Sequence, residues 1–88
     1  MSPAKIIVVQ FSDDWGQDPM SRISRIRDFA EALHWKLADA GQGEVPDMDV
    51  ATAQVTVNVF DAHALGDVRR DVVKQLRQHR LLEYADVA

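Results

Sequence analysis

The most informative absence in this 88-residue chain is cysteine, of which there is none. A disulfide scaffold, a thiolate metal site and a thiol-dependent enzyme are therefore excluded. No apolar run approaches the ~20 residues of a membrane span, and we expect neither a membrane segment nor a signal peptide. Basic residues number 10 against 14 acidic ones, which disfavours a broad nucleic-acid groove. We expect one cytoplasmic globular domain over residues 1–88.

Four segments have the residue patterns of strands. Lys5–Phe11 is β-branched and apolar on both faces, which predicts a central strand whose second face meets a cover or a partner. Ala53–Phe60 alternates valine with polar residues, as in a sheet with one open face. Glu44–Val50 contains Pro46 and is predicted to be a short, irregular edge strand. The last strand is expected at Glu83–Val87.

The first predicted helix has clear boundaries. Asp18 is a carboxylate N-cap, and Pro19 follows at the position where proline is best tolerated. The helix is expected to end at about Ala40, with Gly41 as the residue after it. Its inward stripe is predicted to be Ile23, Ile26, Phe29 or Ala30, Leu33, Leu37 and Ala40.

A second helix is predicted over roughly Ala62 to Arg80, with Asp61 as its N-cap. Its apolar stripe is expected to comprise Leu65, Val68, Val72 and Leu76, with Val73 beside it. The same helix carries Arg69, Arg70, Lys74, Arg77 and Arg80, interleaved with Asp67 and Asp71. This face is interpreted as solvated and partly salt-bridged, with an acidic partner as the alternative.

The element order predicts an α+β fold, a two-layer sandwich of βαββαβ order whose antiparallel sheet carries both helices on one face. The turn Gly41-Gln42-Gly43-Glu44-Val45 and the Asp61-initiated helix resemble those of small bacterial ferredoxin-like (α/β-plait) domains of unknown function. The resemblance implies a fold and no reaction, because the plait carries many functions. It also implies pairing through the open sheet face, as such domains commonly show.

The partner-binding candidates are aromatics outside the core and polar residues of the open face. Trp35 falls off the apolar stripe of its helix and is predicted to contact a loop or a partner. Trp15, in a polar loop, is expected either to close the edge of the core or to contact a partner. The open sheet face is predicted to present Gln54, Thr56, Asn58 and Phe60.

Histidines and acidic residues are the remaining candidates for chemistry. His34, His63 and His79 share no i, i+3 or i+4 spacing, so no helical metal pair is predicted. They are interpreted as surface residues, with His34 or His63 in a ligand pocket as the alternative. The acidic loop of residues 13–18 could bind a cation, or it is a solvated loop. No catalytic residue, metal or cofactor is predicted.

Three functions follow from these features. The preferred one is a non-enzymatic protein-binding module, immunity- or inhibitor-like or homodimerising, that uses the open sheet face and Trp35. Its partner would be another protein, such as a basic target of the acidic loops, or a second copy of the chain. A small plait-dimer enzyme or ligand sensor with His34 or His63 in its pocket is the second. Weak nucleic-acid binding through the basic helix is the third.

Overall fold

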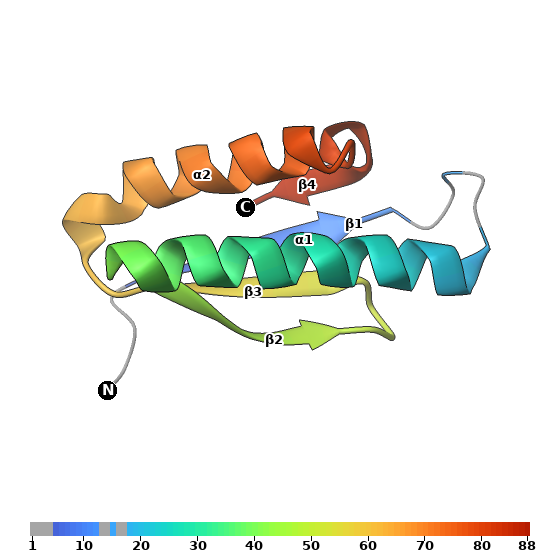
Figure 1. Cartoon of the computed structure of the whole chain (residues 1–88), viewed down its shortest axis with the longest axis horizontal. Helices are drawn as coiled ribbons and strands as arrows, with labels where there is room; N and C mark the ends of the chain where they lie inside the picture. The colour runs from blue at the N-terminus through green and yellow to red at the C-terminus, as the bar shows by residue number, and fades with distance from the viewer. Residues whose placement is uncertain (1–4, 13–14, 16–17) are drawn as a thin grey trace.

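A computed structural model describes residues 5–12, 15 and 18–88 of the chain. It contains two α-helices, four strands and two short 3-10 helices (Figure 1). In chain order these elements are β1 (Lys5–Phe11), α1 (Pro19–Ala40), β2 (Gly43–Asp49), β3 (Gln54–Val59), η1 (Ala62–Ala64), α2 (Leu65–Gln78), η2 (Leu82–Tyr84) and β4 (Ala85–Val87).

The four strands form one antiparallel sheet in the order β2-β3-β1-β4. β1 and β3 are central, and Ile7 of β1 lies opposite Val57 of β3. β2 pairs only with β3, and β4 pairs only with the end of β1. The two strands with the strongest β patterns are therefore the interior ones, and the two weaker strands are the edges.

Both helices lie on the same side of this sheet (Figure 1). The core forms between them and the inward side chains of β1 and β3, all of which are buried: Ile7, Val9, Phe11, Val55, Val57 and Val59. The helices contribute Ile26, Phe29, Ala30, Leu33, Leu37, Val68, Val72 and Leu76. The α+β arrangement of an antiparallel sheet and two helices is confirmed.

Local capping fixes both ends of α1. The Asp18 side chain accepts a hydrogen bond from the backbone N–H of Ser21, and Pro19 begins the helix. Gly41 has a φ of 67°, and the backbone N–H of Gln42 donates to Leu37 O across 3.0 Å. The left-handed residue lets the chain turn directly into β2. The predicted bounds of α1 are confirmed, although Ala40 is exposed and Ile23 is only half-buried.

The edge strand β2 is irregular, as its proline predicts. The pairing with β3 shifts between Glu44 and Asp47, on either side of Pro46. Proline donates no ladder hydrogen bond, so a bulge at this position accommodates it at the edge of the sheet. At the start of the strand, a side chain at Gly43 would run into the carbonyl oxygen of Asn58.

Three predicted bounds were wrong: the start and the end of α2, and the start of β4. The segment after Asp61 begins with the 3-10 turn η1, and α2 starts only at Leu65, because the Asp61 side chain caps His63 two residues on. The chain leaves α2 at Gln78, and the positive φ of Arg80 (58°) turns it back. Residues 83 and 84 belong to η2, so β4 has only three residues.

Candidate functional site

The side of the sheet away from the helices, here called the outer face, is set by the strand register. Side chains that lie directly opposite each other across a pair share a face. Ile6 lies opposite Asn58, and Val8 lies opposite Thr56. The outer face comprises Ile6, Val8, Gln10, Glu44, Asp47, Asp49, Gln54, Thr56, Asn58 and Asp86.

One end of the outer face, at the start of β1 and the end of β3, is apolar and exposed. Ile6 keeps 57% of its surface accessible, and Phe60, which follows β3 with the same alternation, keeps 49%. Phe60 is two residues beyond Asn58, so it is the diagonal neighbour of Ile6 on this face. No element of the described chain covers either side chain from the outer side. Of the predicted open-face residues, Gln54, Thr56 and Asn58 do lie on this face.

The charged residues of the outer face are all acidic. Glu44, Asp47 and Asp49 lie along β2, and Asp86 lies on β4 at the opposite edge. Glu44 lies beside Asn58, near Ile6, whereas Asp86 lies opposite Gln10 toward the other end of β1. Sheet-to-sheet pairing of two copies would bring like charges together, which is unfavourable in a desolvated interface.

The amide side chains of this face are hydrogen-bonded within the sheet. The Gln54 side chain donates to Oε1 of Gln10 across 2.7 Å, and Gln10 in turn donates to the backbone oxygen of Thr52. Asn58 donates to a carboxylate oxygen of Glu44 across 3.2 Å. These hydrogen bonds are made within the sheet, and Ile6 and Phe60 remain as the exposed large apolar side chains of this face.

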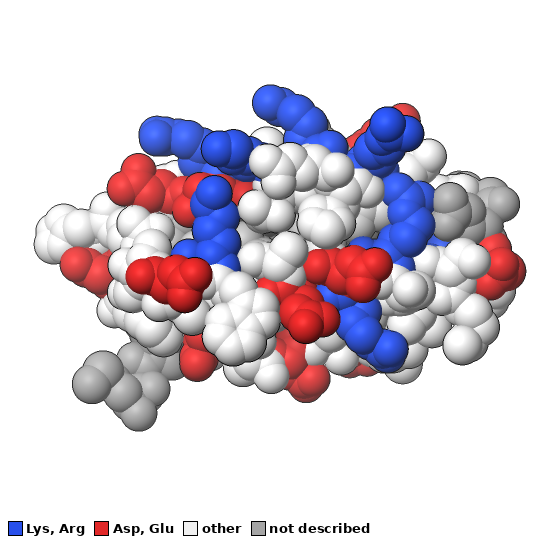
Figure 2. All heavy atoms as spheres, viewed as in Figure 1, with Lys and Arg blue, Asp and Glu red and all other residues white. Residues whose placement is uncertain are grey.

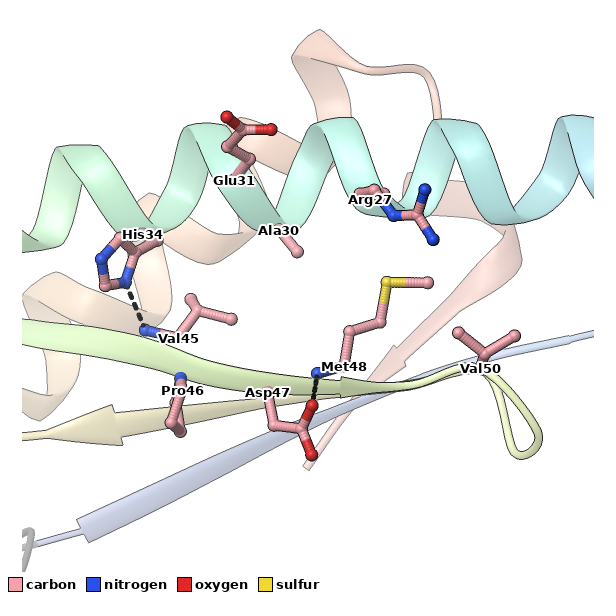
Figure 3. Close-up of a pocket in the computed structure, with 9 residues that line it drawn as sticks. All are labelled: Arg27, Ala30, Glu31, His34, Val45, Pro46, Asp47, Met48 and Val50. Carbon is pink, nitrogen blue, oxygen red and sulfur yellow. Dashed lines mark hydrogen bonds between the residues drawn. The ribbon is translucent and has the colours of Figure 1, made fainter.

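A cavity of about 350 Å³ lies on the helix side of the sheet, between α1 and β2 (Figure 3). We call it the α1–β2 cavity. Ala30 and Arg27 reach into it from the helix, and Val45, Met48 and Val50 reach into it from the strand side. The other residues that line its rim are Glu31, His34, Pro46 and Asp47.

His34 closes one end of this cavity. Its Nδ1 atom accepts a hydrogen bond from the backbone N–H of Val45 across 3.0 Å (Figure 3). Since Nδ1 is an acceptor, the neutral ring carries its proton on Nε2. Of the two histidines predicted for a pocket, His34 therefore lines one and also anchors an edge strand.

His63 and His34 are not brought together. The side chain of His63 is 97% exposed and lies 3.1 Å from the Asp61 carboxylate, at the start of the α2 segment. His63 is not among the residues that line the α1–β2 cavity. The geometry gives His63 the environment of a solvated surface residue. The third histidine, His79, ends α2 and packs edge-on against Phe29.

The two tryptophans differ in exposure. Trp35 is 60% exposed on α1, with its ring edge-on to His34, so it lies in the helical layer and not with the outer-face residues. Trp15 is 7% exposed and stacks on Tyr84 with a centroid distance of 4.8 Å. The guanidinium of Arg25 lies over the Trp15 ring. Of the two placements expected for Trp15, the structure shows the one that closes the edge of the core.

Three shifted pKa values lie outside these surfaces. The backbone N–H of Ser21 lowers the pKa of Asp18, and the backbone N–H of His63 lowers that of Asp61. A hydrogen bond with Glu83 raises the pKa of Tyr84. The two aspartates stabilise the beginnings of turns, so their shifts reflect capping.

Positive charge gathers over α2. Figure 2 shows lysine and arginine side chains along the edge of the molecule that this helix forms. Arg70 is paired with Asp67 at 3.7 Å, and both side chains are largely exposed, so the pair contributes little to stability. The exposed basic residues of this segment are Arg69, Arg70, Lys74, Arg77 and Arg80.

The described residues contain no cluster of three or more histidine, aspartate or glutamate side chains placed to hold a metal ion. The predicted cation loop falls largely on residues 13, 14, 16 and 17, which lie outside the described residues. None of the helices in the described part of the chain is both long and apolar enough to cross a membrane. Comparison with protein-family models, curated proteins and solved structures gives no match to this chain.

Proposed function

We propose that this chain is a ferredoxin-like (α/β-plait) domain that functions as a protein-binding module through its outer face. The strand order β2-β3-β1-β4 and the alternation of strands and helices support the fold. The observation that carries the function is the 57% exposure of Ile6 on a sheet face whose charged residues are all acidic. Isolated exposed apolar residues are common, but here Phe60 lies diagonally beside Ile6.

The partner is a protein with a basic surface. Glu44, Asp47, Asp49 and Asp86 are complementary to lysine and arginine, and such complementarity speeds encounter and selects the partner. A second copy of the chain fits less well, since its outer face carries the same four carboxylates. An immunity- or inhibitor-like role toward a basic target agrees with this charge pattern.

Cross-linking in the cells that produce the protein tests the proposal. The wild-type chain is compared with Ile6→Glu, which introduces a charge at the exposed apolar end of the outer face, and with Met20→Glu as the control. Met20 is 76% exposed on α1, so its substitution adds the same charge away from the outer face. A partner captured by the wild type and by Met20→Glu, and lost with Ile6→Glu, is the expected result. The purified partner should then bind less tightly as salt rises.

Equal capture by all three proteins would overturn the outer face as the binding surface. Sedimentation equilibrium tests whether a second copy of the chain occupies the outer face. A homodimer formed through this face would become a monomer on Ile6→Glu substitution. Trp35→Ala provides a further distinction. Trp35 lies on α1 in the helical layer, so its removal should leave outer-face binding unchanged, and loss of the partner would shift the contact to the helices.

A further inference from the structure

The exposed Arg27 lines the α1–β2 cavity, above an apolar surface. Within the described residues, the Arg27 guanidinium makes no hydrogen bond or ion pair. Figure 3 shows it extending over Met48 at the mouth of the cavity. The planar guanidinium can bind a carboxylate through two parallel hydrogen bonds.

The walls below Arg27 are apolar. Ala30 is 7% exposed, and Met48 packs against the core while its thioether points into the cavity (Figure 3). Val50, just after β2, is 46% exposed and borders the same space. A flexible methionine side chain adapts to varied apolar ligands. The volume, about 350 Å³, is at the lower end of the range for small-molecule sites.

The lining carboxylates are turned away from the space. In Figure 3, Glu31 points from α1 away from β2, and Asp47 points to the other side of β2. Asp47 also accepts a hydrogen bond from the backbone N–H of Met48. The Val45 N–H, which would otherwise face the helix, is satisfied by His34. Arg27 is therefore the charged group that a ligand in the cavity would meet.

We propose that the α1–β2 cavity binds a small monocarboxylate with an alkyl or aryl body. The carboxylate pairs with the Arg27 guanidinium, and the body packs against Ala30 and Met48. An amine of the same shape would place a cation beside Arg27 and is rejected. An alcohol keeps the apolar contact and lacks the charge-assisted hydrogen bonds, so it binds more weakly. This ligand site is on the helical layer and is independent of the protein partner proposed for the outer face.

Methyl NMR with three matched probes tests this site. Octanoate, octylammonium and 1-octanol are titrated into protein labelled at the methionine and alanine methyl groups. Octanoate should shift the Met48 and Ala30 resonances in a saturable way, whereas the exposed Met20 methyl serves as the internal reference. Arg27→Gln should weaken octanoate binding at least about tenfold, and Arg27→Lys should retain part of it.

Lys74→Gln is the control for long-range charge, since it removes one positive charge from the exposed surface of α2 and should leave octanoate binding unchanged. The proposal is overturned if octylammonium shifts Met48 as strongly as octanoate, or if Arg27→Gln and the wild type bind octanoate equally. It is also overturned if octanoate leaves the Met48 methyl unshifted. None of these results affects the outer-face proposal, which is tested with Ile6→Glu.

Discussion

Nδ1 of His34 accepts the backbone N–H of Val45 across 3.0 Å, and this bond joins α1 to the irregular part of the edge strand. Val45 lies next to the shift in register around Pro46, where the strand ladder with β3 is interrupted. The histidine ring therefore satisfies a half-buried donor at the point where the sheet is least regular. An edge strand that contains a proline is held by a side chain from the neighbouring layer.

Replacing His34 should loosen β2 locally. His34→Ala leaves the Val45 N–H without its acceptor, which we expect to cost about 1–2 kcal/mol in the free energy of unfolding. Amide exchange followed by NMR should show that the substitution accelerates exchange at Val45 more than at the β3 amide of Val57. His63→Ala is the control, because that side chain is 97% exposed and its loss should change neither quantity. Unchanged protection of Val45 in His34→Ala would contradict the role assigned to this bond.

Two glycines with opposite surroundings give a paired prediction. A Cβ at Gly43 would overlap the carbonyl oxygen of Asn58, whereas one at Gly66 would meet nothing within 4 Å. Gly43→Ala should therefore destabilise the protein by about 1–3 kcal/mol through forced separation of β2 and β3. Gly66→Ala, near the start of α2, should stabilise it by about 0.4–1 kcal/mol, since alanine favours the helix. Denaturant unfolding compares the two, and shifts of the same sign would refute the local packing argument.

The N-cap of α1 predicts a pH dependence. Hydrogen bonds from Ser21 lower the pKa of Asp18 in the folded state, so the unfolded chain binds this proton more readily. The stabilisation is therefore present above the unfolded pKa of aspartate and is lost as pH falls through the folded pKa. Asp18→Ala should lower the melting temperature at neutral pH, and its difference from the wild type should shrink as pH falls from about 5 to about 3.

The matched variant Asp18→Asn keeps an oxygen that can accept from the Ser21 N–H without the titrating charge. It should retain part of the stability at neutral pH, and this part should not change over the acidic range. A difference between Asp18→Ala and the wild type that stays constant down to low pH would show that the carboxylate charge is not involved.

The fold was predictable where local chemistry determines it. Asp18, Pro19 and Gly41 mark the ends of α1 in sequence and in structure, and alternating valines mark β3. The 3-10 turn after Asp61 was missed. The sequence does not distinguish an aspartate that accepts from the backbone N–H two residues ahead from one that accepts three residues ahead. Leu81 was missed as a core residue since it becomes buried only through the left-handed turn at Arg80.

The candidate sites were predictable to different degrees. Strand alternation places Thr56 and Asn58 on the outer face, and it leaves Ile6 beside them. The α1–β2 cavity was not predictable, because Arg27 and Met48 are distant in sequence and meet only when β2 packs beside α1. Nor could the sequence decide the position of Trp15, which depends on stacking with Tyr84 near the other end of the chain.

Arg25 provides the last prediction, because it connects three segments. Its guanidinium donates to the backbone oxygens of His79 and Arg80, at 3.0 and 3.2 Å, and lies 5.2 Å from the centroid of the Trp15 ring. These carbonyls follow the end of α2, where a cation is favoured. Arg25→Met keeps the apolar stem and removes the guanidinium, and we expect a loss of about 2 kcal/mol in unfolding free energy.

Arg27→Met is the matched control for this substitution, because Arg27 lies two residues away on α1 and makes no hydrogen bond or ion pair with the described residues. Denaturant unfolding followed by Trp15 fluorescence, in a Trp35→Phe background, measures both variants. Arg25→Met should also change the Trp15 emission of the folded state, since the cation leaves the ring face. Equal destabilisation by the two variants would mean that helix propensity, and not the contact with the end of α2, determines the effect.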